Sequence, residues 1–301
     1  MAVLVVGSVA FDTVKTSSEV ADEVLGGSGT YCAYAASFFA PVWLMSPVGE
    51  DLPAEHLAAM RQRGIDTSAI QVVKGGRTFR WVGRYSEDFL DRTTEQVELN
   101  VFGDYDTTLA PACRGAEYVF LANGAPQAQK AVVEQLERPR MVLLDTMDHW
   151  IENEREALDD VLGHVDGLLV NDEEARLLTG ERNLLRAARR MSEMGPRVVL
   201  IKKGEHGSLL VADGRPFAVP AWLTETVKDP TGAGDCFGGA LIGHLARTGD
   251  VSFESLKSAV SYGTVVASFC IEDFSVGRLQ ALTLEEIEQR RRDFASMVSW
   301  S

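Results

Sequence analysis

The sequence predicts a layered α/β sandwich built around a mainly parallel sheet. Three observations lead to this fold class: short apolar runs that do not alternate with polar residues, helical periodicity between those runs, and a C-terminal part dominated by helices. Strands that are covered on both faces are apolar almost throughout, and strands that alternate with helices form βαβ units. For 301 residues, one large domain with an appendage or two small domains would account for the length.

The apolar runs predict six strands of the core sheet. They are rich in leucine and β-branched residues and occupy residues 3–6, 42–45, 118–121, 141–144, 167–170 and 198–202. Apolar residues at helical spacing lie between them, at residues 30–39, 53–63, 152–162, 172–178 and 184–194. After residue 232 helical patterns dominate, at residues 233–247, 253–270 and 284–294.

Two segments lack this alternation of apolar strands and helices, and they predict a small protruding sheet. Residues 15–25 are polar without a helical stripe, and residues 78–102 read as two alternating strands joined by a polar turn at residues 86–95. The apolar side chains of this hairpin share one face: Phe79, Trp81 and Tyr85, then Val97, Leu99 and Val101. That face covers a ligand, a second subunit or the hairpin's own domain, and the sequence leaves these three possibilities open.

Composition excludes several classes of protein. With 29 Lys plus Arg against 44 Asp plus Glu, the formal charge is −15, which argues against binding to a nucleic-acid backbone or to anionic lipid. No stretch approaches the roughly 20 apolar residues that cross a bilayer, and we expect no signal peptide because the first residues lack a basic leader. The four cysteines lie far apart, which predicts free thiols in a reducing, cytoplasmic setting without structural zinc.

The stretch DPTGAGDCFGGA at residues 229–240 is the most informative part of the sequence. Small residues before an apolar helix let several backbone N–H groups converge on one point, where the helix dipole also favours negative charge. Asp235 would stand beside an anion bound there. Such a carboxylate makes chemical sense if it takes a proton from an attacking hydroxyl while the amides stabilise a phosphoryl group in transfer. The alternative is an acid that only decorates a helix N-terminus.

This stretch and three others resemble motifs of the ribokinase, or PfkB, family of carbohydrate and nucleoside kinases. The others are GGSGTYCA at residues 26–33, NDEE at residues 171–174 and KKGEHG at residues 202–207. The resemblance implies a ribokinase-like, three-layer α/β/α sandwich with a mainly parallel central sheet and a small β-sheet lid. The kinase core would comprise residues 1–14, 26–76 and 104–301, and the lid residues 15–25 and 77–103.

The resemblance also implies roles at the phosphoryl-transfer end of the site. Asp235 would deprotonate the acceptor hydroxyl, and the N–H groups of Gly232, Ala233, Gly234 and Asp235 would form an anion hole for the γ-phosphoryl group. Glu174 would organise Mg²⁺ through water, and one carboxylate suffices because Mg²⁺ keeps much of its water shell. The residues implied to bind ATP are Asn171, Lys202, Gly204, Gly207 and Thr231.

At the acceptor end, Asp12, Gly26 and Gly27 match the family's contacts with sugar hydroxyls. Tyr31 stands where many relatives carry Asn; a tyrosine can stack on a ring or donate one hydrogen bond, but it lacks an amide's paired donor and acceptor. This departure argues against an ordinary ribose or fructose pocket. Asn123, which follows a predicted strand, either points into the cleft or forms a plain Asn-Gly turn.

We therefore predict an ATP-dependent phosphotransferase that acts on a hydroxymethyl group of a sugar or related polyol, with ATP and Mg²⁺ as cofactors and a monovalent cation such as K⁺ as in many relatives. A nucleoside kinase and a non-catalytic sugar- or nucleotide-binding protein are the alternatives. The substrate would be a small molecule, and the lid would either join two copies in a homodimer or cover its own chain.

A dinucleotide fingerprint and a Walker motif are both missing, since VGSVAF at residues 6–11 has one glycine and no Gly-Lys pair occurs. Asp145 lies at the end of another predicted strand. It either lies near the site or only ends that strand without a role in the site.

Overall fold

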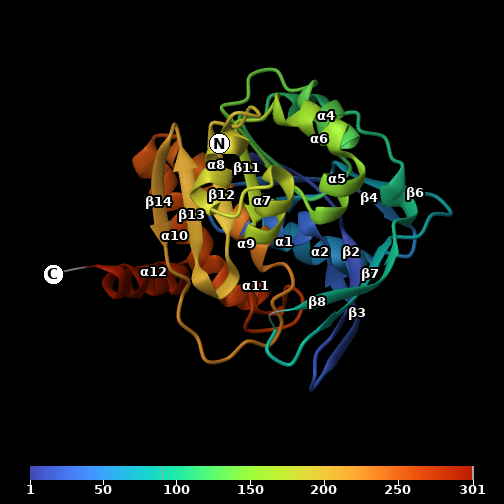
Figure 1. Ribbon diagram of the computed structural model, residues 1–301. Coiled ribbons are helices and arrows are strands. Elements are labelled where there is room, and N and C mark those ends of the chain that lie inside the picture. The colour runs from blue at the N-terminus through green and yellow to red at the C-terminus, as the bar shows by residue number, and fades with distance from the viewer. Residues whose placement is uncertain (90, 300–301) are drawn as a thin grey trace.

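The computed structural model describes residues 1–89 and 91–299, and its strands form two sheets (Figure 1). The large sheet contains β1 (Val3–Val6), β4 (Val42–Gly49), β5 (Ile65–Asp66), β6 (Ile70–Val73), β9 (Tyr118–Leu121), β10 (Met141–Asp145), β11 (Gly167–Asn171), β12 (Val198–Lys202), β13 (Ser208–Ala212) and β14 (Arg215–Val219). The small sheet contains β2 (Ala10–Lys15), β3 (Val20–Gly26), β7 (Phe79–Tyr85) and β8 (Arg92–Glu98).

Helices cover both faces of the large sheet. One face packs against α1 (Ser28–Ala36), α2 (Ala54–Gln62), α9 (Ala233–Thr248), α10 (Phe253–Cys270), α11 (Gly277–Ala281) and α12 (Leu284–Val298). The other packs against α3 (Pro111–Arg114), α4 (Pro126–Val133), α5 (Asp148–Asn153), α6 (Arg155–Leu162), α7 (Asp172–Thr179) and α8 (Leu184–Ser192). Alternate residues of β1 enter different clusters, Val3 and Val5 on the first face and Leu4 and Val6 on the second. This double burial explains why the core strands are apolar throughout.

The predicted fold class is confirmed. All six predicted core strands form, and they lie side by side in the order β12-β11-β10-β9-β1-β4 with parallel pairing throughout. The carboxyl ends of parallel strands meet at one edge of the sheet, which is where ligands bind in α/β folds. Asp145, Asn171 and Lys202 are the last residues of three neighbouring strands, so the fold itself brings them together.

Two elements of the core differ from the prediction. The helix expected over residues 152–162 is two helices, α5 and α6, because Glu154 leaves the helical conformation at φ −129° and ψ 35°. The hairpin of β13 and β14 adds antiparallel strands to the edge beyond β12 and was not predicted. Its turn contains Asp213 and Gly214, both at positive φ, which is the local sequence signal that identifies such a hairpin.

The small sheet projects from the core at the lower right of Figure 1. It includes β2, which carries Asp12 and which the sequence placed in the core; β2 pairs antiparallel with β3 and parallel with β7. The hairpin strand expected to reach Val101 ends at Glu98 instead. The reason is Asn100, which takes φ 48° and donates from Nδ2 to the Thr78 carbonyl at 3.0 Å, so that a short 3₁₀ turn, η1 (Asn100–Gly103), follows.

Candidate active site

The N-terminus of α9 forms the centre of the candidate site. Gly232 precedes the helix at φ 76°, a left-handed conformation that glycine adopts at no steric cost. A Cβ at this position would also lie 2.4 Å from the ring of Tyr31, so close contact requires glycine as well. The helix begins at Ala233 as the sequence predicts, and Asp235 lies in its first turn.

The expected ring of four amides is smaller in the structure. The N–H of Ala233 donates to the Pro230 carbonyl at 3.2 Å, so the turn before the helix uses it. The N–H of Asp235 lies close enough to its own carboxylate to lower the pKa of that group. Within residues 1–89 and 91–299, the N–H groups of Gly232 and Gly234 have no acceptor and are available to an anion.

Asp235 lies in an environment that favours its neutral form. Burial, and then the negative charge of Asp145, raise its pKa to about 7, while Lys202 and Arg92 of the small sheet oppose the shift. A carboxyl group with a pKa near neutrality is suited to general base catalysis, because it accepts a proton readily and is still partly ionised at neutral pH.

A buried ion pair stands at the strand ends beside this helix. Lys202 Nζ donates to Asp145 Oδ2 at 2.7 Å, and the two side chains are 18% and 6% exposed. A Cβ added to Gly234 would lie 3.1 Å from the same nitrogen, so the ammonium group lies against the first turn of α9. Asp145 therefore lies near the site, which the sequence left open.

Asn171 and Glu174 form a reciprocal cap at the start of α7. Asn171 Oδ1 accepts from the N–H of Glu174, and Glu174 Oε2 accepts from the N–H of Asn171, both at 2.7 Å. Burial raises the pKa of Glu174 to about 7, with Lys202 opposing and Asp145 adding to the shift. The motif thus has a structural role, and it also fixes one carboxylate near Lys202.

The glycine motif after β12 makes a tight connection to β13. Gly204 takes φ 51° within a 3₁₀ turn, η2 (Gly204–His206), and Gly207 takes φ 78°. A Cβ at Gly207 would lie 2.0 Å from the Val219 carbonyl oxygen, so the hairpin itself requires this glycine. The connection starts directly after Lys202, which places it beside the site.

The residues expected to hold an acceptor meet where the small sheet joins the core. Asp12 is 4% exposed, and its Oδ2 accepts from the N–H of Gly27 at 3.4 Å. A Cβ at Gly26 would lie 1.9 Å from that same oxygen, so the carboxylate lies directly over the glycine. Burial raises the pKa of Asp12 to about 7; the N–H of Gly27 opposes the shift, and Asp229 and Asp235 add to it.

Tyr31 and Asp229 complete this end of the site. Tyr31 is 1% exposed, and its hydroxyl has no hydrogen-bond partner in the described part of the chain. Burial, and then the charge of Asp12, raise the pKa of Tyr31 well above its ordinary value. Asp229 accepts from the N–H of Thr231 through Oδ1 at 2.9 Å, whereas its buried Oδ2 is unpartnered among the described residues. Asp229 is the first residue of the DPTGAGDCFGGA stretch, and no role was predicted for it.

The side-chain amide of Asn123 forms hydrogen bonds with two neighbouring residues. Its Nδ2 donates to Met147 Sδ at 3.1 Å, and its Oδ1 accepts from Trp150 Nε1 at 2.9 Å. These contacts fix the amide against the loop that follows β10. Its backbone carbonyl accepts from Ser28 Oγ at 3.2 Å, at the start of α1.

A contact between the small sheet and the turn before α9 was not predicted. Thr231 Oγ1 donates to the hydroxyl of Tyr85 at 3.1 Å, which joins β7 of the small sheet to the residue before Gly232. Part of the apolar hairpin face therefore covers its own chain, whereas Phe79 contacts Phe102 at the end of its own segment, with ring centres 5.6 Å apart. No local sequence signal identifies such a pairing, because the two residues are 146 positions apart.

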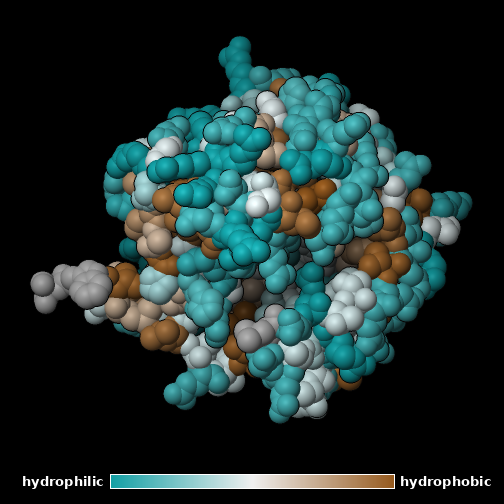
Figure 2. Space-filling view, viewed as in Figure 1, coloured by the Kyte–Doolittle hydropathy of each residue, from teal (hydrophilic) through white to brown (hydrophobic). Residues whose placement is uncertain are grey.

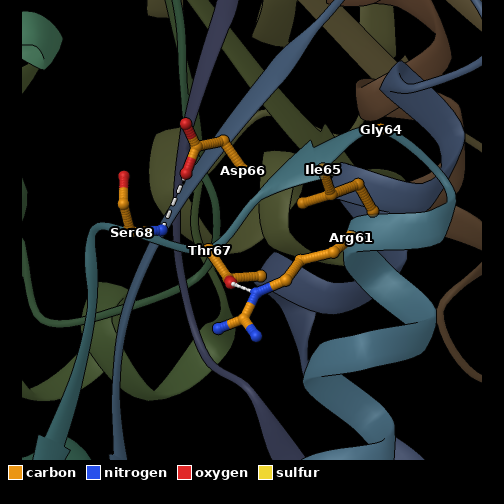
Figure 3. A pocket seen from close by; sticks show the side chains of 6 residues that line it. All are labelled: Arg61, Gly64, Ile65, Asp66, Thr67 and Ser68. Carbon is orange, nitrogen blue, oxygen red and sulfur yellow. Dashed lines mark hydrogen bonds between the residues drawn. The ribbon is translucent and has the colours of Figure 1, made fainter.

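The surface is hollowed near the middle of the face shown in Figure 2, between the elements labelled α9 and β8 in Figure 1. A separate pocket is lined by Arg61, Gly64, Ile65, Asp66, Thr67 and Ser68 (Figure 3). It adjoins β5, the edge strand, whereas Asp145 and Lys202 lie on strands beyond β4 and β1. Its polar groups bond to one another, Arg61 Nε to Thr67 Oγ1 at 2.7 Å and the Ser68 N–H to Asp66 Oδ1 at 2.8 Å.

The described residues contain neither a ready-made metal cluster nor a membrane-spanning helix. No group of three or more His, Cys, Asp or Glu side chains there could hold a metal ion by itself. None of the helices in the same residues has both the length and the apolar character needed to cross a membrane.

Comparison with known proteins identifies the family. The model of the pfkB family carbohydrate kinases matches residues 3–281, so the chain belongs to this family, and it is a PfkB-type sugar or nucleoside kinase. This confirms the family that the motifs predicted.

Relatives in this family are named for different acceptors. The chain is 28% identical over 251 residues to cytidine kinase of Thermococcus kodakarensis, covering 81% of this chain and 88% of the relative. It is 26% identical over 282 residues to ribokinase of Staphylococcus aureus, covering 88% and 87%. Its fold is similar to that of an E. coli protein provisionally named ribokinase II, solved with ATP and Mg²⁺, with a TM-score of 0.79, 19% identity and coverage of 97% and 99%.

Proposed function

We propose that this protein transfers the γ-phosphoryl group of ATP to a hydroxymethyl group of a sugar or a nucleoside, with Asp235 as the general base. The observation that carries the proposal is the position of Asp235: a carboxyl group with a pKa of about 7 lies in a helix turn whose Gly232 and Gly234 amides are free. The acceptor oxygen bonds to the γ-phosphorus, the bond to the β-phosphate oxygen breaks, the acceptor proton passes to Asp235, and ADP leaves.

ATP and Mg²⁺ are the proposed cofactors, and their presence in the E. coli structure supports them. Glu174 fits a role near Mg²⁺, because Asn171 occupies only one of its two carboxylate oxygens. Bound Mg²⁺ would neutralise charge on the β- and γ-phosphates. A monovalent cation such as K⁺ is part of the proposal, and the unpartnered Oδ2 of Asp229 offers it an anionic ligand.

The side chains at the acceptor end of the site, Asp12 and Tyr31, favour a ligand with hydroxyl groups. The Asp12 carboxylate can accept two hydroxyl hydrogen bonds, and the buried Tyr31 hydroxyl has no partner among the described residues. Two relatives are named for cytidine and for ribose, and both compounds carry hydroxyl groups that could bind at such a site. The proposal therefore includes both sugars and nucleosides as acceptors. The homodimer through the small sheet and the cytoplasmic location remain predictions.

An acceptor screen tests the proposed function. We expect ADP formation from Mg²⁺-ATP to depend on one group within a panel of nucleosides, pentoses, hexoses and inositols, and to vanish for the analogue that lacks the hydroxymethyl oxygen. A response confined to nucleosides would exclude the plain-sugar reading. ATP binding without acceptor-dependent turnover across the panel would support the non-catalytic alternative instead.

The pH dependence of the reaction tests the base. We expect kcat/KM to fall as the pH drops below about 7, because the raised pKa of Asp235 makes the protonated, inactive form increasingly populated there. The measurement is kcat/KM for the acceptor from about pH 4 to about pH 8.5 at fixed free Mg²⁺. A profile that stays flat down to the ordinary carboxyl range near pH 4 would contradict the assignment.

A further inference from the structure

Lys202 places a full positive charge inside the candidate site. Its side chain is 18% exposed and that of its partner Asp145 is 6% exposed. Burying two charges costs desolvation free energy that their attraction often fails to offset, and apolar replacements of such pairs are often neutral or stabilising. Fold stability alone is therefore a weak reason for this pair to stand at the edge of the sheet where ligands bind.

The ammonium group lies at the meeting point of the other candidate groups. A Cβ on Gly234 would be 3.1 Å from Nζ, so the charge lies beside one of the two free amides of α9. The same charge lowers the pKa of both Asp235 and Glu174, so it acts on the base and on the carboxylate of α7. A helix N-terminus and an ammonium group that converge in this way favour a multiply charged anion.

Lys202 also keeps donors for a ligand. An ammonium group has three N–H donors. Among residues 1–89 and 91–299, Asp145 is the one hydrogen-bond acceptor recorded for Nζ, which leaves two donors directed elsewhere. Burial alone lowers the pKa of Lys202, but Asp145 and Glu174 outweigh it and the pKa lies above its ordinary value, so the group stays charged.

We propose that Lys202 is a catalytic residue whose ammonium group contacts the phosphoryl group in transfer, and that Asp145 is the positioning residue that holds it there. This proposal rests on the proposed kinase function and deepens it. Lys202 gives up no proton during the step: it offsets the charge that spreads over the phosphoryl oxygens while the acceptor proton goes to Asp235.

Asp145 is itself well fixed for this role. Its Oδ1 accepts from the N–H of Thr146 at 2.9 Å, which leaves Oδ2 for the ammonium group. Its backbone carbonyl accepts from Gln129 Nε2 at 3.0 Å, and the same amide donates to the Ala122 carbonyl of the neighbouring strand end. A carboxylate held at both its side chain and its backbone sets the position of a flexible lysine.

The first test is Lys202→Met. We expect kcat to fall by about 10²- to 10³-fold, the range seen when one donor to a developing oxyanion is removed. Affinity for ATP should fall more than affinity for ADP, because ADP lacks the group that Lys202 contacts. The matched control is Lys130→Met, which removes a lysine from an exposed pair with Asp160 on α4 and α6 and should leave kcat unchanged. Equal losses for ATP and ADP with unchanged kcat would overturn the proposal.

The double variant Lys202→Met with Asp145→Asn separates catalysis from structure. The single change leaves Asp145 buried without a counter-charge and is expected to lower the melting temperature; the double change removes both charges and should restore it. We expect kcat to stay low in the double variant even though stability returns. Recovery of kcat to near the parent value would show that the pair is only structural. A parent enzyme without acceptor-dependent turnover would refute the proposed function itself, and the ATP-to-ADP affinity ratio would then still report on Lys202.

Discussion

Asp235→Asn is expected to lower kcat by at least ~10²-fold while the affinity for ATP changes only a few-fold. Asparagine has nearly the same shape but cannot accept the acceptor's proton. The free amides of Gly232 and Gly234 remain, so nucleotide binding should persist. Steady-state kinetics with the acceptor found in the screen, together with ATP titration of the variant, measure both quantities.

Stability measurements distinguish this result from misfolding. The folded-state pKa of Asp235 lies above that of an unfolded aspartate, so ionisation of this group destabilises the fold progressively from about pH 4 to about pH 7, and the full effect is present above about pH 7. Asp235→Asn should therefore melt at the same temperature as the parent at pH 8, or higher. The control is Glu285→Gln, which changes an exposed acid in the first turn of α12 and should leave kcat unaltered. Turnover at the parent level in Asp235→Asn would remove Asp235 from the role of base.

Gly232→Ala is expected to damage both the fold and the reaction. The new side chain would occupy a left-handed conformation, which costs roughly 1–2 kcal/mol, and would press on the Tyr31 ring, with overpacking adding about 1–3 kcal/mol. Relief of that contact must move the helix N-terminus or Tyr31, so the amides and Asp235 lose their alignment. We expect the free energy of unfolding to fall by about 2–5 kcal/mol and kcat to fall at least ~10-fold.

Gly214→Ala is the matched control for the backbone contribution. Gly214 has the same φ of 76°, but a Cβ there would meet nothing within 4 Å. Its position in the turn between β13 and β14 lies outside the candidate site. Chemical denaturation should show a loss of about 1–2 kcal/mol for this variant, with kcat unchanged. Equal losses in the two alanine variants would mean that the contact with Tyr31 contributes nothing.

The core of the fold could be predicted because its signals are local. A strand buried on both faces is apolar along its whole length, and β1 and β12 were placed within their observed bounds for that reason. The break at Glu154 could not be predicted, because an amphipathic stripe continues across it. The end of β8 was missed because Asn100 bonds to Thr78, a residue 22 positions earlier at the other end of the predicted hairpin.

The candidate site was predictable as a set of positions but not as a set of contacts. Motifs at the carboxyl ends of parallel strands are brought together by topology, so the approach of Asn171 to Lys202 follows from the fold. The bond between Thr231 and Tyr85 depends on how the small sheet is placed against the turn before α9, and no short segment encodes that arrangement. The Ala233 N–H is unavailable to an anion because it donates to the Pro230 carbonyl within one turn, and the motif alone does not predict this hydrogen bond.

The membership of β2 in the small sheet has a consequence for swapping parts between relatives. Asp12 lies on that strand, six residues after β1 ends, and its neighbours there are Val24 of β3 and Trp81 of β7. A chimaera that exchanges this sheet as a cassette therefore exchanges the buried aspartate too, and it must bring along the glycine beneath that side chain. The small sheet and the carboxylate proposed to bind the acceptor are therefore exchanged together. We expect such a chimaera to change its acceptor specificity when its small sheet is exchanged.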